Sequence, residues 1–539
     1  MQTDEMWFMA AVAALLLLLL YTLVLQPAFF CPLARIPSAH WSCPLSSYWI
    51  LDARKGAREN ETLFEAHLRL GPMVRVAPNT LSVDGVDAMR TVYQGGFEKS
   101  DWYKVFDHYG VPHMFSTLGS KEHARRKRII SHVYSRSFIH ASVPARAQSR
   151  AILLGRLVPL LGQEAAAACD DPKGTEVQSL FMATTMDLIS AYIFGLRNST
   201  DFIQDEAYRH HWLQLYLSRH HHHFWPQELP GVTRLCTRLG LRLYPSFVDD
   251  ANEEIRVWNR RMCDMAEQSM RTDVDDQVCL AADEAVVFKA MHAGIDREES
   301  TEGEASLLYH TSIQQRSLAV ASEILDQLLA GHETAGIVLT YIAWRLSLSP
   351  DVQTQLREEL LSIEPCREMA TDELGKLPHP KTLHSLPILH AVVMETLRLH
   401  APIPGPQPRS TPYPSCQIGG YSIPGGVRIA SLAHTLHLDE RVYPDARRWD
   451  HTRWLVPGAD DDEDRKKQMN RHFWAFGSGG RMCIGSNFAL TGIKNTIAAI
   501  YTNFQTLVVQ DDGMEQTDGY SSRPASDKLH LKFTAVCVT

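Results

Sequence analysis

The sequence lacks the features that mark several large classes of protein. Its 539 residues include only ten cysteines, which are scattered without paired spacing, so a disulfide framework is not indicated and we expect reduced thiols facing the cytosol. The formal net charge is -9, which argues against a nucleic-acid-binding protein, and basic residues cluster only locally. No internal repeat is visible, which argues against a repeat architecture.

Positive charge is also missing in front of the long apolar run from Met6 to Leu25. The run is long enough to cross a bilayer as a helix. A cleaved signal peptide is the alternative, but the run is long for one and no basic segment precedes it. The nearest positive charges, among them Arg35 and Arg54, follow the run, so the rest of the chain should face the cytosol. We expect a membrane anchor over residues 1–30.

The middle of the chain gives coarser signals. Pro27 and the prolines after it are expected to break any helix and form a stiff connector. Residues 71–83 predict two short strands, and residues 176–194 have the pattern of an amphipathic helix. Residues 271–304 are acidic and poorly periodic, and residues 460–467 join an acidic run to a basic one. Both are expected to be surface connections.

A cysteine near the C-terminus stands in a glycine-rich loop. Residues 476–485 read Phe-Gly-Ser-Gly-Gly-Arg-Met-Cys-Ile-Gly, and a helical pattern begins at Ser486. A cysteine in front of a helix faces free N–H groups and the positive end of the helix dipole, which favour the thiolate. Such a loop can present one sulfur ligand to a metal. A buried inert cysteine is the alternative, and no second Cys or His stands at the short spacing of a zinc site from Cys483.

The loop resembles the haem-binding loop of the cytochromes P-450, which are haem-thiolate monooxygenases. Phe476, Gly479, Arg481, Cys483 and Gly485 occupy the positions of that pattern. The resemblance implies that Cys483 is the axial ligand of haem b and that its thiolate promotes O–O cleavage. It also implies a mostly α fold with a minor β part, preceded by one transmembrane helix. The chain would then be a single-pass protein of the endoplasmic reticulum membrane, with a cytosolic haem-thiolate monooxygenase domain over residues 31–539.

A second motif lies in an apolar helix over residues 318–346, whose middle reads Ala-Gly-His-Glu-Thr from Ala330 to Thr334. A glycine and polar residues are unfavourable inside a buried helix, and such exceptions mark functional sites. Asp326, Ala330 and Thr334 share one helix face. A threonine bonded to its own helix is the alternative. The segment resembles the oxygen-activation motif of the cytochromes P-450, in which the helix widens beside the haem. There Thr334 would hydrogen-bond the oxygen and Glu333 would relay protons from water.

Further positions are assigned to the haem propionates by the resemblance. His123 and Lys127 lie on one helix, with lysine where arginine is usual, so the contact of Lys127 is expected to be weaker or shared with Arg128. A solvated basic face is the alternative for this helix. Arg409 follows an extended proline-rich segment, and Arg481 lies in the cysteine loop. Guanidinium groups match carboxylates bidentately, so both arginines are expected to bind propionates.

A Glu–Arg pair supports the loop in the resembling family. Glu395 and Arg398 lie in a run that is too apolar for a surface helix, so the pair is expected to be buried and fully paired. The resemblance offers Arg453 as the second arginine of this network. We expect these residues to support the haem loop and not to act in catalysis.

The motifs occur in the family's order, so the leading hypothesis is an NADPH-dependent monooxygenase. A reductase would supply electrons, and one oxygen atom of O2 would enter a lipophilic small molecule. The motif variants resemble fungal microsomal members of secondary metabolism. A haem-thiolate isomerase or dehydratase that works without reductase is the alternative, and Thr334 with Glu333 argues against it. A non-enzymatic haem-binding protein is a third. The pocket segments predicted by the resemblance mix aromatic, aliphatic and polar residues, and comprise 100–116, 209–230, 318–330 and 517–524.

Overall fold

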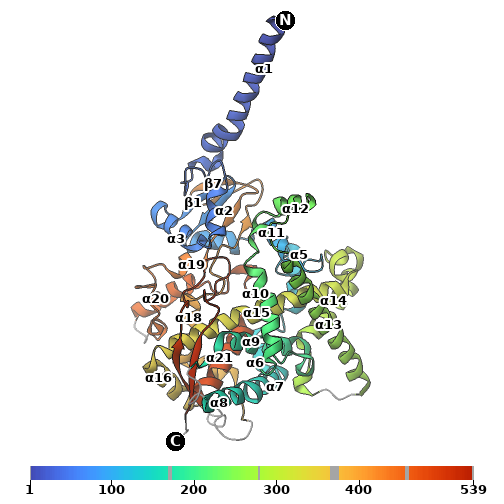
Figure 1. Ribbon diagram of the computed structural model, residues 1–539, viewed down its shortest axis with the longest axis vertical. Coiled ribbons are helices and arrows are strands. Elements are labelled where there is room, and N and C mark those ends of the chain that lie inside the picture. The colour runs from blue at the N-terminus through green and yellow to red at the C-terminus, as the bar shows by residue number, and fades with distance from the viewer. Residues whose placement is uncertain (1, 168–172, 277–279, 364–374, 456–459, 537–539) are drawn as a thin grey trace.

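Helices make up most of the chain in the computed structural model, which describes residues 2–167, 173–276, 280–363, 375–455 and 460–536. Figure 1 shows a body of packed helices from which the first helix projects. The longer helices of the body are α3 (Glu59–Leu70), α5 (Ser120–Ile130), α7 (Val143–Ile152), α8 (Val158–Ala167), α9 (Val177–Phe194), α10 (Glu206–His220), α13 (Phe247–Asp276), α14 (Val286–Glu302), α15 (Arg316–Ser347), α16 (Pro350–Leu361), α18 (Pro387–Leu399), α20 (Asp460–His472) and α21 (Ser486–Asn503). The shorter ones are α2 (Tyr48–Lys55), α4 (Val86–Met89), α6 (Arg136–Ala141), α11 (Phe224–Glu228), α12 (Pro230–Arg238), α17 (Pro380–Ser385) and α19 (Ala433–His437).

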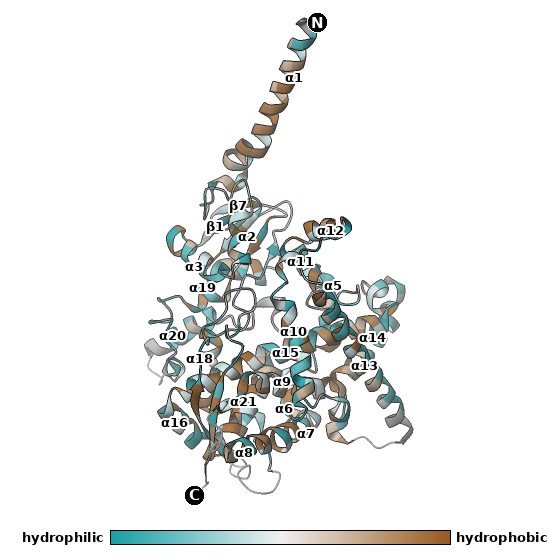
Figure 2. Cartoon of the chain, in the orientation of Figure 1, coloured by the Kyte–Doolittle hydropathy of each residue, from teal (hydrophilic) through white to brown (hydrophobic). Residues whose placement is uncertain are grey.

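The projecting helix is α1 (Gln2–Leu20), which continues as a π-helical stretch, η1 (Tyr21–Phe30). Asp4–Phe30 is long and apolar enough to cross a membrane, and none of it is buried in the protein. Figure 2 shows this apolar surface clear of the body. The segment is therefore a candidate transmembrane helix. The expectation that Pro27 breaks the helix is wrong, because Pro27 lies inside η1, where the widened turns of a π-helix accommodate it.

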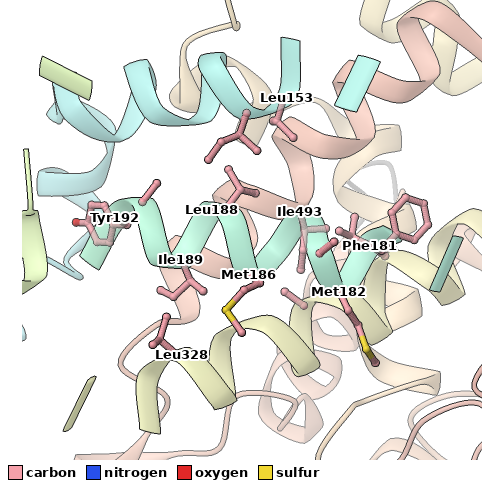
Figure 3. Close-up of a cluster of buried hydrophobic side chains, with 14 of the residues drawn as sticks. Leu153, Phe181, Met182, Met186, Leu188, Ile189, Tyr192, Leu328 and Ile493 are labelled. Carbon is pink, nitrogen blue, oxygen red and sulfur yellow. The ribbon is translucent and has the colours of Figure 1, made fainter. Parts of the chain in front are cut away.

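The core is built around α9, which the sequence pattern described as amphipathic. In the structure this helix is buried on every side, because α7, α14 and α15 pack against it. Figure 3 shows its side chains between Leu153, Leu328 and Ile493. Glycines let α15 approach closely: a Cβ atom at Gly336 would lie 2.9 Å from Met182. The helix pair holds the middle of α15 in a fixed place.

The strands form three small sheets, as the predicted minor β part requires. The largest has the order β1-β2-β8-β5-β3, the second the order β4-β10-β9, and β6 and β7 form a hairpin. In chain order the strands are β1 (Met73–Ala77), β2 (Thr80–Val83), β3 (Glu98–Lys99), β4 (Thr175–Glu176), β5 (Arg409–Ser410), β6 (Ser415–Ile418), β7 (Tyr421–Pro424), β8 (Arg428–Ala430), β9 (Phe504–Gln510) and β10 (His530–Ala535). The antiparallel pairing of β3 with β5 sets Lys99 directly opposite Arg409.

Two expected surface connections contain helices instead. Residues 271–304 include α14, whose apolar start (Val286, Val287 and Phe288) is buried in the main core. Residues 460–467 belong to α20. Met469 of this helix and Tyr443, which precedes the helix in the chain, belong to a small separate core. Both segments are rich in charged residues, so their sequence pattern did not indicate the few buried apolar residues that hold each helix in place.

Candidate active site

Backbone hydrogen bonds and one obligatory glycine shape the cysteine loop. The N–H of Cys483 donates to the carbonyl of Phe476 at 2.9 Å. Gly479 has φ +71°, and a Cβ atom there would lie 2.3 Å from the backbone oxygen of Tyr93. Both conditions exclude any residue with a side chain. Lys127 of α5 donates to the carbonyl of Gly480 at 2.8 Å. The loop is thus tied to the helix that carries the predicted propionate ligands.

Cys483 is accessible to water and at the same time deep in the protein. Its side chain is exposed, yet burial raises the pKa of its thiol. Both hold for a group that lines a space inside the molecule. The backbone N–H groups of Gly485 and Ser486 and the charge of Lys127 lower this pKa, as the position before α21 predicts, but burial outweighs them. The expected effect of the helix end on Cys483 is therefore present, and burial acts against it in the chain alone.

One face of α15 borders the same internal space. Most of this helix is buried, but Asp326 and Thr334 are partly accessible and Ala330 is exposed. These three positions form the face that the sequence predicted. The charge of Asp326 raises the pKa of Cys483, so the helix and the loop lie near each other across the space. α15 remains α-helical throughout, so the expected widening does not appear as a change of helix type.

Thr334 and Glu333 have different surroundings although they are adjacent. The hydroxyl of Thr334 donates to the carbonyl of Ala330 at 2.8 Å, and it is accessible from the internal space. Glu333 is buried and accepts a hydrogen bond of 2.7 Å from the hydroxyl of Tyr216 on α10. Arg523 of the C-terminal loop lies 3.9 Å from Glu333. The alternative of a back-bonded threonine is thus realised, but at a position that faces the space.

Two buried cations stand side by side at one edge of the site. Lys99 and Arg409 are 6% and 3% exposed and are paired across β3 and β5. The ammonium of Lys99 contacts the carbonyl of Phe115 and lies 3.8 Å from the ring centre of Tyr103. Arg409 donates to the hydroxyl of Tyr103 at 3.1 Å. Like charges directly opposite in a sheet are destabilising, and burial and the charge of Arg409 lower the pKa of Lys99.

The remaining predicted cations belong to the same cluster. Arg481 donates to the backbone carbonyls of Thr117 and Leu118. Burial and the charge of Arg409 lower the pKa of Arg481 to about 10. Burial, followed by the charges of Arg481, Lys99, Lys127 and Arg409, lowers the pKa of His123 to about 3. The structure therefore brings all four predicted propionate positions together. Arg128 is exposed, so it does not share the role of Lys127.

The cation cluster fits the carboxylates of haem b. Among the residues that the structure describes, no carboxylate lies within 4.0 Å of Lys99, Arg409 or Arg481. A buried charge needs a partner, and an anionic ligand would supply one here. The two propionates of haem b carry that charge, and the thiol of Cys483 suits its iron. Sequence analysis missed Lys99, because its place in the cluster arises only from the pairing of β3 with β5.

The predicted Glu395–Arg398 pair is buried and complete. The carboxylate of Glu395 accepts two hydrogen bonds from Arg398, at 2.8 and 2.9 Å, and lies 3.4 Å from Arg453. Arg398 also donates to the carbonyl of His437, whose ring accepts from the N–H of Trp474 at 2.8 Å. Trp474 lies two residues before the cysteine loop. The network therefore positions the loop, as the sequence predicted.

Comparisons with known proteins agree with this geometry. The family model for cytochrome P-450 matches residues 304–530, which include α15, the Glu395 network and the cysteine loop. The cytochrome P-450 monooxygenase avaI of Aspergillus versicolor is 26% identical over 447 residues, covering 80% of this chain and 95% of the relative. The cytochrome P-450 monooxygenase cypX of Dothistroma septosporum is 24% identical over 497 residues, covering 92% and 88%. The chain carries a cytochrome P-450 domain.

This domain indicates the general chemistry of the protein, because cytochromes P-450 hold haem through a cysteine thiolate and use O2. A further relative, the cytochrome P-450 monooxygenase stcB of Emericella nidulans, is 27% identical over 469 residues, covering 85% of this chain and 79% of the relative. The matched region spans Thr334, Arg409 and Cys483. It leaves out Lys99 and His123, whose placement comes from the structure.

Proposed function

We propose that this cytochrome P-450 is an NADPH-dependent monooxygenase that inserts one oxygen atom of O2 into a lipophilic small molecule. The step would be a tailoring reaction in fungal secondary metabolism, in line with the fungal relatives named as monooxygenases. One observation carries the proposal. The accessible thiol of Cys483 and the accessible face of α15 border one internal space, and buried cations without a carboxylate partner among the described residues lie at its edge.

The chain's own residues divide the work of holding haem b. Cys483 would supply the thiolate that binds the iron, and Phe476 fixes the loop through its carbonyl. Arg409, Arg481 and Lys99 supply the positive charge that two propionates require.

His123 and Lys127 complete this set from α5, His123 inside the cluster and Lys127 at the cysteine loop. When bound, the haem activates O2, with electron density pushed from the thiolate.

Proton delivery falls to the middle of α15. The hydroxyl of Thr334 donates its proton in the hydrogen bond to the carbonyl of Ala330. Its oxygen can therefore only accept a hydrogen bond, from water in the internal space. Glu333 is the nearest acid along the chain and can take up and release a proton through its carboxylate. Its contacts with Tyr216 and Arg523 tie the acid to α10 and to the C-terminal loop. Both are segments predicted to line the substrate pocket.

The protein's place in the cell follows from its first helix. Residues 1–30 would form a single-pass anchor in the endoplasmic reticulum membrane, and residues 31–539 would form one cytosolic monooxygenase domain. The unburied apolar surface of Asp4–Phe30 supports the anchor. A cytosolic domain can meet an NADPH-dependent reductase, which would supply the electrons.

Spectra and turnover test the proposal separately. Reduced protein with carbon monoxide should show the strongly red-shifted Soret band of thiolate ligation, and Cys483→Ser should lose it. Cys416→Ser, which alters a cysteine in the β6–β7 hairpin, should keep the band. A band that survives in Cys483→Ser would remove Cys483 as the ligand.

Turnover needs a source of the unknown substrate. Membranes that contain the protein and a reductase should convert a component of extracts from a strain that lacks the gene, and conversion should stop without NADPH or O2. Conversion that needs neither would favour the isomerase or dehydratase alternative instead.

A further inference from the structure

Asp326 is a carboxylate on the accessible face of α15, two helical turns before Thr334. Its side chain keeps 18% of its surface accessible, whereas His113, which faces it, has none. Among the described residues, Nδ1 of His113 contacts this carboxylate and lies 3.3 Å from one of its oxygens. A carboxylate offers about four acceptor positions, so most of this capacity is unused on the side of the internal space.

The charge of Asp326 is already compensated. The Nε2 atom of His113 lies 2.8 Å from the carbonyl of Phe106, which only accepts, so this nitrogen carries a proton. The other nitrogen, Nδ1, faces the carboxylate of Asp326 and needs a second proton to be attracted to it. Burial opposes that charge, but Asp326 outweighs burial and raises the pKa of His113. His113 and Asp326 thus form a neutral imidazolium–carboxylate pair.

The same argument decides against a metal ion at this place. Ligand atoms of His108, His113 and Asp326 lie within 4.8 Å of one another, a spacing that a metal could bridge. A metal would have to displace His113 from Asp326, because Nε2 of His113 donates to the carbonyl of Phe106 and Nδ1 faces the carboxylate. The pair is left as a group that binds an organic ligand.

The neighbourhood favours an uncharged hydrogen-bond donor. Lys99 adds positive charge near Asp326, which disfavours a substrate ammonium group. Aromatic rings gather on the loop that carries His113: the rings of Phe106 and Phe115 lie 5.3 Å apart, and that of Tyr520 lies 6.4 Å from Phe106. Apolar walls with one directed polar group are typical of small-molecule sites.

We propose that Asp326 determines substrate specificity by accepting a hydrogen bond from a neutral hydroxyl group, an alcohol or a phenol, on a lipophilic substrate. The inference rests on the proposed function, because it places this substrate in the haem site. It assigns the chemical class of the substrate and adds a residue, Asp326, to which no role has been given so far. Asp326 acts in binding and orientation and takes no part in oxygen chemistry.

Ligands that report their own binding test the inference. Arylimidazoles bind haem iron through the imidazole nitrogen and shift the Soret band, so no knowledge of the natural substrate is needed. The probes are 1-phenylimidazole, its 3- and 4-hydroxyphenyl derivatives, and a derivative with a protonated aminomethyl group. In the wild type at least one phenol should bind about tenfold more tightly than the parent, as expected for a hydrogen bond to a charged group. The aminomethyl probe should gain nothing.

Variants separate the two members of the pair. Asp326→Asn should reduce the preference for the phenol severalfold. His113→Gln leaves the carboxylate without its compensating charge, so the aminomethyl probe should now bind about tenfold more tightly than the parent. Glu299→Gln is the control, since this carboxylate is exposed on α14 and pairs with Arg316 at 2.8 Å, and it should leave all preferences unchanged.

Each outcome has a defined meaning. Equal binding of phenols and parent in the wild type, or a full preference in Asp326→Asn, overturns the inference. If Asp326→Asn does not take up haem, the wild-type comparison and His113→Gln still decide it. A parent probe that gives no Soret shift overturns the haem site, the proposed function and this inference together, whereas a shift without hydroxyl preference overturns the inference alone.

Discussion

The side chain of Thr334 is accessible from the proposed haem site, and its hydroxyl donates to the carbonyl of Ala330 in its own helix. These two features lead to a prediction for Thr334→Ala. Thr334→Ala should keep haem, fold and NADPH consumption, but should divert electrons from product to hydrogen peroxide, because the hydroxyl oxygen that positions the relay water is lost. Such donors contribute roughly 10²-fold or more, and water can replace part of the effect. The measurement is the ratio of product formed to NADPH oxidised, with peroxide assayed alongside.

Two variants control for helix damage. Thr340 lies on the same helix with its hydroxyl bonded to Gly336 at 2.9 Å, but it is fully buried, so Thr340→Val should leave the ratio unchanged. Thr334→Ser keeps the hydroxyl and should restore coupling. An unchanged ratio in Thr334→Ala would remove this residue from the mechanism.

Lys99 gives a second prediction at the residue scale. Lys99→Gln removes a buried positive charge from the propionate end of the haem site, so haem should leave the protein roughly tenfold faster, the value of one charge-assisted hydrogen bond. The measurement is the rate of haem transfer to an excess of apomyoglobin. Lys104→Gln is the matched control, since Lys104 is largely exposed and paired with Asp101. Equal transfer rates in the two variants would show that Lys99 does not hold haem.

The residues of the site fall into two groups: those that a short sequence motif places, and those that contacts between distant segments place. Cys483, Arg481 and Thr334 lie in short motifs, in which local spacing alone sets their relation, and the sequence predicted them. Lys99 and Tyr216 join the site through contacts between distant segments, β3 with β5 and α10 with α15. Nothing local distinguishes a lysine in such a place from a solvated one. The rise in the pKa of Cys483 could not be predicted for a related reason, because burial depends on the whole surroundings.

At the scale of elements, the cysteine loop depends on one glycine. Gly479→Ala forces a side chain into the left-handed region and against the carbonyl of Tyr93, so we expect a loss of roughly 1–3 kcal/mol and a lower haem content. The adjacent Gly480 has nothing within 4 Å of its Cβ position, so Gly480→Ala should behave as wild type. Thermal unfolding and the carbon monoxide band per mole of protein measure both. Equal values for the two variants would contradict the strained loop.

Long apolar helices were predictable, and mixed ones were not. The pattern over residues 318–346 gave nearly the observed bounds of α15, because a helix that is apolar almost all round has few alternatives. α14 and α20 were expected to be connections, since α14 lies in an acidic segment of poor periodicity and α20 begins where an acidic run meets a basic one. A few buried apolar residues determine where such helices form, and the residues that they pack against lie elsewhere in the chain.

For the whole molecule, the anchor and the body should separate cleanly. A chain without residues 1–25 keeps Pro27, whose carbonyl accepts a hydrogen bond of 3.0 Å from the buried Arg75. It should therefore keep the carbon monoxide band while leaving the membrane pellet on sedimentation. In sealed microsomes, added protease should digest the body of the full-length chain. Full protection of the body would contradict a cytosolic domain.

The cation cluster also bears on how much of this protein a cell can accumulate. Before haem binds, the like charges of Lys99 and Arg409 would lie opposite each other without the propionates that we propose to offset them. The newly made chain is then at its least stable, and proteases of the quality-control system act on it first. Abundance would follow the rate of haem biosynthesis, and a host with scarce iron would degrade most of what it translates.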